Sequence, residues 1–169
     1  GVLAGQSLIT LTGSIVRVTG SGLGCDTWPN CHPGSLVPVQ GAAPWIQQLI
    51  EFGNRTLTFV LVALTVWLLV AVYKAGRRSY IKKLAWLQLI GVFVQAVIGG
   101  ISVHMDLKWY AVALHFLPSV FLVFFAALTC VRVMEPDNGV DRREYPRTIQ
   151  YLALGTAAAL ALVPVSYTH

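Results

Sequence analysis

The stretch Phe59–Val72, FVLVALTVWLLVAV, decides the fold of this chain, because it is almost entirely apolar and carries no charge. With its flanks it forms an apolar segment from about Glu51 to Tyr73. A helix needs about 20 such residues to cross the hydrocarbon core of a bilayer. Of the 169 residues, 56% are hydrophobic and 11% are charged, whereas soluble domains carry roughly 25% charged residues. The composition therefore excludes an ordinary soluble domain.

Four further apolar segments accompany this one. Two of them are long enough to span a membrane, from about Leu84 to Val103 and from about Trp109 to Val133. A shorter one, mixed with Thr, Ser and Gly, runs from Val2 to about Val18, and an Ala- and Leu-rich one runs from about Thr148 to Val165. We therefore predict an all-α polytopic membrane protein, a four-helix transmembrane bundle plus the start of a fifth span. The predicted parts are a bundle over 1–134 with an outer loop 19–50, a linker over 135–147, and the start of a second, incomplete bundle over 148–169.

The basic residues predict the orientation in the membrane. The chain has a net charge of +5, and most of its Lys and Arg lie in two loops: Lys74, Arg77, Arg78, Lys82 and Lys83 in one, and Arg132, Arg142, Arg143 and Arg147 in the other. The loop Thr19–Ile50 has no Lys or Arg. Because basic loops stay on the cytoplasmic side, we expect a plasma-membrane protein with a cytoplasmic N-terminus and this loop outside. The charge is a topological signal and does not indicate nucleic-acid binding.

Two of the three cysteines, Cys25 and Cys31, lie in the loop that we expect outside. An oxidising compartment favours a disulfide between them, although two reduced thiols are the alternative. A zinc site with His32 is a weaker interpretation, because the ligand spacing is not that of a structural site. The spacing also excludes covalent haem attachment, which needs C-x-x-C-H. Cys130 is expected to be a small packing residue.

A few polar residues interrupt the apolar segments, and ionisable groups at membrane depth indicate function by default. They are Glu51, Arg55, Arg17 and His115, with Asn54 one turn from Glu51. The helical rise places Asn54 and His115 at similar depth, so we expect them to face each other. A histidine in a bundle suits haem iron, and arginines suit haem propionates. The alternatives are a histidine that only bonds across helices and an i,i+4 pair of Glu51 with Arg55.

The third span carries small and polar residues on one stripe: Leu84, Gln88, Gly91, Gln95, Gly99 and Ser102. Such a stripe is typical of a helix-packing face. Gly99 and Gly100 would also allow a flat ligand to approach the backbone, which is the weaker interpretation. Before the second span, Pro44 to Leu49 suggests a separate amphipathic surface helix.

Several patterns together resemble the haem A synthases, membrane enzymes that convert haem O to haem A. They are SIVRVTGSGLGCDTWPNC (Ser14–Cys31), EFGNR (Glu51–Arg55), QAVIGGISV (Gln95–Val103) and ALHF (Ala113–Phe116). The first is long and specific, and the others support it by their order and spacing. The resemblance covers Gly1 to about Val133 and is to the N-terminal half of the family.

The resemblance implies two similar four-helix bundles, each with a histidine pair suited to haem. His115 matches one histidine of the N-terminal pair and would be the iron ligand. The other is expected within E-x-x-H-R, where this chain has Asn54, so the sequence departs from the family at that position. Glu51 matches an acidic residue considered essential for the reaction, and Cys25 and Cys31 match an outer-loop pair implicated in haem handover or redox coupling.

The activity that the resemblance implies is oxidation of one methyl group of haem O to a formyl group through hydroxylated intermediates, for terminal oxidases that contain haem A. In this interpretation Glu51 relays protons, and Arg17 and Arg55 hold propionates or tune Glu51. Haem O is the substrate in this bundle, and haem b is expected in the second. The expected partners are a haem O synthase, the lipid bilayer, an electron acceptor of unknown identity and a second copy in a homo-oligomer. The alternatives are a b-type haem carrier or electron-transfer protein and a thiol oxidoreductase that uses Cys25 and Cys31.

Overall fold

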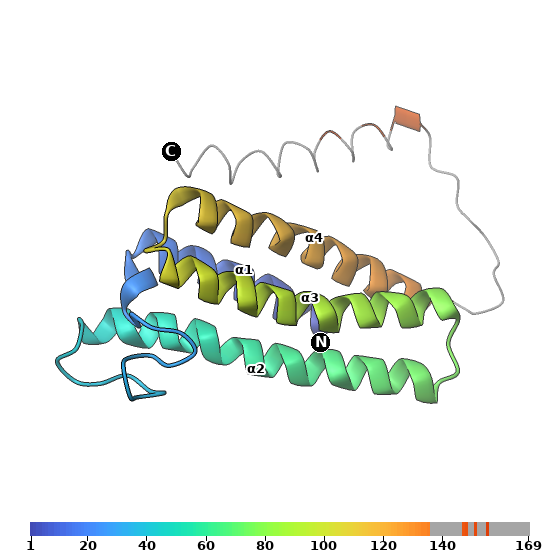
Figure 1. Cartoon of the computed structure of the whole chain (residues 1–169). Coiled ribbons are helices and arrows are strands. Elements are labelled where there is room, and N and C mark those ends of the chain that lie inside the picture. The colour runs from blue at the N-terminus through green and yellow to red at the C-terminus, as the bar shows by residue number, and fades with distance from the viewer. Residues whose placement is uncertain (136–146, 149–150, 152–154, 156–169) are drawn as a thin grey trace.

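Four long helices lie side by side in the computed structural model of the chain, which describes residues 1–135, 147–148, 151 and 155 (Figure 1). The helices are α1 (Val2–Val18), α2 (Trp45–Lys74), α3 (Ser79–His104) and α4 (Trp109–Met134), and a short 3-10 helix, η1 (Ser21–Leu23), follows α1. The predicted all-α bundle is confirmed. The predicted linker and the start of a second bundle fall almost wholly outside the described residues and stay predictions.

The order of the helices around the bundle places α2 and α4 on opposite sides. α1 packs against α2 and α4, and α3 packs against the same two helices. Short loops over 75–78 and 105–108 force α2, α3 and α4 to run antiparallel to their sequence neighbours. Side chains that point inward from α2 and α4 therefore meet across the centre of the bundle, as a ligand held between two helices requires.

Three of the helices, α2, α3 and α4, are long and apolar enough to cross a membrane, whereas α1 is a shorter apolar helix. Their outer surfaces expose large apolar side chains, such as Phe59, Trp67 and Phe124. Lipid rather than water solvates such surfaces, so their exposure is expected of a membrane bundle. The chain is a multi-pass helical membrane protein. We call the end that carries residues 19–44 the disulfide end, and the opposite end, with Lys74 and Arg77, the basic end.

Two helix boundaries differ from the prediction. The expected surface helix from Pro44 to Leu49 is not separate, because α2 begins at Trp45 and continues without a break through Glu51. No Gly or Pro lies between these two residues, so nothing interrupts the helical hydrogen bonds. Similarly, α3 begins at Ser79, before the first apolar residues of its span.

The small and polar stripe of α3 packs inside the bundle, with Leu84, Gln88 and Ser102 buried and Gly91, Gln95 and Gly99 half-buried. Gln88 is fully buried, and its side chain accepts a hydrogen bond from Gln6 of α1 (2.9 Å) and donates one to the backbone carbonyl of Leu122 in α4 (3.1 Å). The surface of Gly91 is covered by Leu122. Because buried polar groups must find partners away from water, this stripe fixes how α1 and α4 pack against α3.

Candidate functional site

The disulfide end is organised around Cys25 and Cys31, which form a disulfide with their Cα atoms 4.3 Å apart. Both cysteines are buried, at 0% and 1% exposed. The predicted pairing is confirmed, and among the described residues no group of three His, Cys, Asp or Glu side chains is arranged to hold a metal ion. The disulfide closes a small loop against the start of α2.

Glu51 and Arg55 hold this loop in place from adjacent turns of α2. One carboxylate oxygen of Glu51 accepts a hydrogen bond from the backbone N–H of Cys25 (2.8 Å), and the other forms an ion pair with the guanidinium of Arg55. Glu51 is only 5% exposed. A carboxylate buried to this extent needs both an opposite charge and hydrogen bonds, and the pair supplies both. The i,i+4 pair that we weighed as an alternative is present.

The guanidinium of Arg55 has no free donor. Its Nε and one Nη2 donor bond Glu51, the other Nη2 donor bonds the carbonyl of Cys25 (2.9 Å), and Nη1 donates to the carbonyls of Thr27 (2.7 Å) and Asn30 (3.1 Å). A guanidinium carries five N–H donors, so all of them are used. Of the two roles assigned to Arg55, tuning Glu51 is compatible with this geometry, and binding a propionate is not.

His32 and Gln48 form a second set of contacts that the sequence analysis missed. Gln48 is fully buried, and its Nε2 donates to the carbonyls of Val39 (3.0 Å) and Ala43 (2.7 Å). Its Oε1 therefore faces His32 Nε2 at 2.9 Å, while His32 Nδ1 lies 2.8 Å from a carboxylate oxygen of Asp26. The hydrogen bond to Gln48 raises the pKa of His32 above its ordinary value, and Asp26 adds to this effect.

Two glycines allow the loop to lie close to the helices. A Cβ on Gly24 would meet the backbone carbonyl of Gln47 at 2.5 Å, so only glycine fits there. The ring of Trp28 lies on Gly100 of α3, where an added Cβ would come within 2.5 Å of it. The surface of Gly100 that we considered for a flat ligand is thus covered by Trp28, which anchors the disulfide loop to α3.

His115 lies inside the bundle on α4, with its imidazole against Gly99 of α3. Its Nδ1 is buried and makes no hydrogen bond with any described residue. Buried polar atoms without a partner are rare in native structures and need an explanation. The simple alternative, a histidine that hydrogen-bonds across helices, does not explain this ring. An imidazole nitrogen without a hydrogen-bond partner suits an iron ligand.

The remaining predicted site residues are not part of one cluster. Asn54 of α2 accepts a hydrogen bond from Thr12 of α1 (2.7 Å), so its side-chain oxygen is directed to α1. Arg17 is exposed in the last turn of α1, and its guanidinium makes no hydrogen bond or ion pair with the described residues. The structure thus joins Glu51 and Arg55 to the disulfide loop and leaves His115 as a separate interior group.

Comparison with known proteins agrees with this architecture. The model of a cytochrome oxidase assembly protein family, COX15-CtaA, matches residues 1–166. A protein named heme A synthase from Exiguobacterium sibiricum is 34% identical over 155 residues, covering 88% of this chain and 49% of its own length. Those from Lysinibacillus sphaericus and Staphylococcus aureus are 38% identical (81% of this chain, 44% of the relative) and 31% identical (88% and 50%).

The chain spans about half the length of these relatives. No solved structure matches it. The family match extends over nearly the whole chain and includes the helices, the disulfide loop and His115. The chain therefore belongs to the COX15-CtaA family of cytochrome oxidase assembly proteins.

Proposed function

We propose that this chain forms the substrate-binding bundle of a haem A synthase, which oxidises one methyl group of haem O to a formyl group through hydroxylated intermediates. The observation that carries this proposal is His115, a half-buried histidine inside a membrane bundle whose buried Nδ1 has no hydrogen-bond partner among the described residues. Relatives at 31–38% identity that are named heme A synthase support the same activity. The product serves terminal oxidases that contain haem A.

In this proposal His115 holds the iron of the substrate haem. α2 lies across the bundle from α4, and its Asn54 is already bonded to Thr12. Asn54 offers no imidazole, so the second face of the substrate haem keeps an open position. The exposed guanidinium of Arg17 is the remaining partner for a propionate, because Arg55 is saturated.

Glu51 is proposed to relay the protons that leave the substrate carbon during its oxidation. The ion pair with Arg55 and the hydrogen bond from Cys25 hold it as a carboxylate at the disulfide end. A carboxylate in a fixed position can act as a general base without a large rearrangement. Arg55 is a positioning residue, because it fixes both Glu51 and the backbone of the disulfide loop.

The test compares His115→Ala and Glu51→Gln in the full-length enzyme supplied with haem O. We expect His115→Ala to lose the absorbance spectrum of the bound substrate haem and to form no product. Glu51→Gln keeps an acceptor for the Cys25 N–H, so we expect it to bind haem O and to lose turnover. Unchanged conversion of haem O to haem A in both variants, measured by mass, contradicts the assignment.

A thiol oxidoreductase is a weaker second candidate, because a catalytic disulfide must be reached by its partner. Cys25 and Cys31 are buried at 0% and 1% exposed, whereas reactive cysteines are partly exposed. A haem carrier is the third candidate, and it predicts a stable haem spectrum without any haem A product. The wild-type protein in the same experiment separates it from the enzyme, since a pure carrier forms no haem A even with Glu51 in place.

We further propose that the N-terminus is cytoplasmic and that the disulfide end lies outside the plasma membrane, because most of the Lys and Arg residues lie in the loops at the basic end. Alkaline phosphatase inserted in the loop 36–42 should be active, and the same insertion at 75–78 should be inactive. The opposite pattern overturns the orientation. The proposed partners are a haem O synthase as donor, an electron acceptor and a second copy of the protein, and haem b is proposed for the other half of the enzyme.

A further inference from the structure

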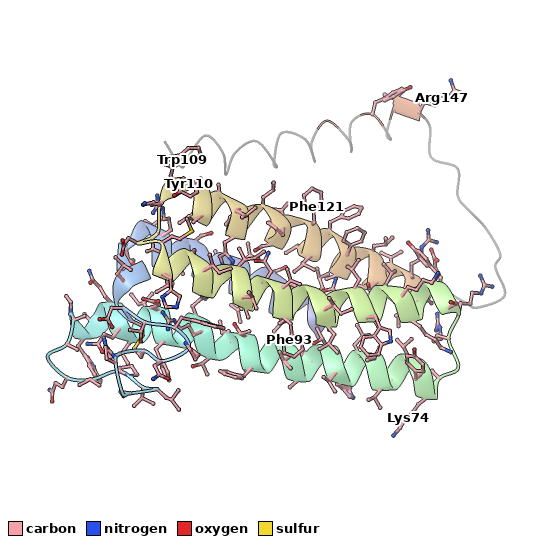
Figure 2. The ribbon with its side chains drawn as sticks, viewed as in Figure 1. Lys74, Phe93, Trp109, Tyr110, Phe121 and Arg147 are labelled. Carbon is pink, nitrogen blue, oxygen red and sulfur yellow. A yellow bond between two sulfur atoms is a disulfide. The ribbon has the colours of Figure 1, made fainter. Side chains whose placement is uncertain are left out.

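A long apolar hollow of about 590 Å³ lies between α3 and α4, within the range of pockets that hold small molecules. Its α3 side is a single stripe that runs from Lys83 to Gln95, and its α4 side runs from Leu117 to Phe125. Twelve residues of helix make this stripe about 18 Å long. Gly91 contributes no side chain to the lining, and Leu122 of α4 packs directly on its backbone. Figure 2 shows Phe121, one of the aromatic residues of the hollow, on α4.

The two ends of this hollow differ in chemistry. The lining is apolar except for Lys83 near the basic end and Gln95 at the opposite end. Gln95 Nε2 donates to the hydroxyl of Ser119 (3.1 Å), but its Oε1 is buried and has no hydrogen-bond partner among the described residues. The side chain that ends the hollow therefore carries a buried, unsatisfied acceptor, and a ligand hydroxyl that reached it would satisfy it.

The Gln95 end is also the end next to His115. Ser119, the partner of Gln95, donates in turn to the backbone carbonyl of His115 (3.2 Å). Gly99, one helical turn from Gln95, contacts the His115 ring. The Gln95 end of the hollow therefore lies about one helical turn from the level of His115 on both α3 and α4.

We propose that this hollow binds the farnesyl chain of haem O, with the hydroxyl at the root of that chain bonded to Gln95 Oε1. This inference rests on the proposed function. Haem O differs from haem b by a hydroxyethyl group that carries a fifteen-carbon isoprenoid chain, in the place where haem b has a vinyl group. The long apolar shape fits the chain, and the single free acceptor lies where the hydroxyl emerges from the ring.

Such a groove orients the haem ring, and it adds little to the binding free energy by removing the chain from water. Lipid is as apolar as the hollow, so moving the chain from lipid into it yields mainly packing contacts. A chain fixed between α3 and α4 prevents the ring from turning about the bond between its iron and His115. The same ring methyl is then always presented to the reacting position, which accounts for oxidation at one methyl.

The experiment fills the hollow in the full-length enzyme in nanodiscs and measures the dissociation constants of haem O and haem b by absorbance titration. Val94→Trp fills it, and Val97→Trp is the matched control, because both valines are about half exposed on α3 but only Val94 lines the hollow. We expect Val94→Trp to raise the dissociation constant of haem O roughly tenfold, because the chain loses its packing contacts in the hollow. We expect haem b to bind the Val94→Trp protein as it binds the wild type, and Val97→Trp to change neither affinity.

A second pair of variants tests the hydroxyl contact. Gln95→Leu removes the free acceptor, and Ser119→Ala removes the bond between Gln95 and Ser119 but keeps the acceptor. We expect Gln95→Leu to lower the preference for haem O over haem b by several-fold, and Ser119→Ala to preserve it. An equal loss of preference in both variants overturns the contact to the hydroxyl.

The tail proposal is overturned if Val94→Trp and Val97→Trp bind haem O equally, which would mean that lipid fills the hollow. It is also overturned if Val94→Trp weakens both haems to the same extent, which would mean that the hollow only shapes the bundle. Failure of the proposed function gives a different result: the wild-type enzyme would bind haem O and form no oxidised product by mass.

Discussion

The disulfide end and the interior around His115 differ in whether their polar groups have hydrogen-bond partners. At the disulfide end, every donor of Arg55 and both oxygens of Glu51 are bonded, and Gln48 uses its oxygen and its amide together. In the interior, His115 Nδ1 and Gln95 Oε1 have no partner among the described residues. A saturated network is rigid and has no capacity left for a ligand. The comparison teaches that the paired charges of Glu51 and Arg55 hold the disulfide loop in a fixed position, whereas the unsatisfied atoms of His115 and Gln95 mark where a ligand can bind.

The largest effect that the comparison predicts comes from breaking the scaffold at Arg55. Arg55→Leu leaves the buried carboxylate of Glu51 without its counter-charge, which typically costs about 3–5 kcal/mol in the free energy of unfolding. Thermal unfolding of the purified protein in detergent measures this loss. The control is Arg17→Leu, which removes an exposed guanidinium without a described partner and should change the stability little. Equal losses of stability in the two variants would contradict the role of Arg55 in holding Glu51 and the disulfide loop.

A smaller effect is expected at the contact between the loop and α3. Gly100→Ala places a methyl group within 2.5 Å of the Trp28 ring, and such overpacking typically costs about 1–3 kcal/mol. Gly53→Ala is the matched helical control, because nothing lies within 4 Å of its added Cβ. That variant should be neutral, or more stable by up to about 1 kcal/mol from helix propensity. If Gly100→Ala is as stable as Gly53→Ala by thermal unfolding, Trp28 does not anchor the loop.

The stability of the loop at the disulfide end should depend on pH through the protonation of His32. Its two neighbours, Gln48 Oε1 and Asp26, are both acceptors, so only the doubly protonated ring bonds both. The pKa of His32 is raised in the folded state. The stabilisation is therefore complete below the ordinary pKa of 6.5 and is lost as the pH rises through the folded-state pKa. Hydrogen exchange of the loop amides should accelerate over that range.

The control for this titration is His32→Gln, which cannot change its charge. Asp26 faces the ring directly, and the carboxylate of Glu51 acts on it from α2. His32→Gln keeps both carboxylates in place, so any part of the pH dependence that this variant loses belongs to His32. An identical acceleration of exchange in the His32→Gln protein would refute the assignment.

The smallest change in stability is expected at His115, although its role in binding is the largest. His115→Leu removes a ring whose buried Nδ1 has no described hydrogen-bond partner, and it replaces a polar group with an apolar one of similar size. We expect the unfolding free energy without haem to stay within about 1 kcal/mol of the wild type. His104→Leu, at the exposed end of α3, is the control. A large destabilisation by His115→Leu, without one by His104→Leu, would show that the His115 ring stabilises the bundle and is not free for a ligand.

Much of the fold was predictable from local patterns. The apolar runs predict α2, α3 and α4, and the stripe of Gln88, Gly91 and Ser102 predicts the buried face of α3. The start of α2 was predicted as helical, from Pro44 to Leu49, but as a separate surface helix. The local patterns did not show that it continues without a break into the membrane-length segment. The pairing of Cys25 with Cys31 was expected from their compartment, and the structure confirms it.

The candidate site was predicted only in part. Glu51, Arg55 and His115 were conspicuous because charged and imidazole groups are rare in apolar segments. Gln48 and His32 carried no such signal, since they lie in a polar loop and in the first turns of α2. One signal could have indicated His32: it is the single histidine of a loop that has no Lys or Arg.

The sequence by itself determined that the chain crosses a membrane, where its spans lie and which few residues interrupt them, because apolar length and rare charges are properties of one segment at a time. Only the tertiary structure decided which polar groups are satisfied. Hydrogen bonds such as those from Arg55 to Cys25, Thr27 and Asn30 join positions far apart in the chain. Whether a donor is used up or an imidazole is left open depends on those distant partners, and this distinction separates the scaffold from the binding position.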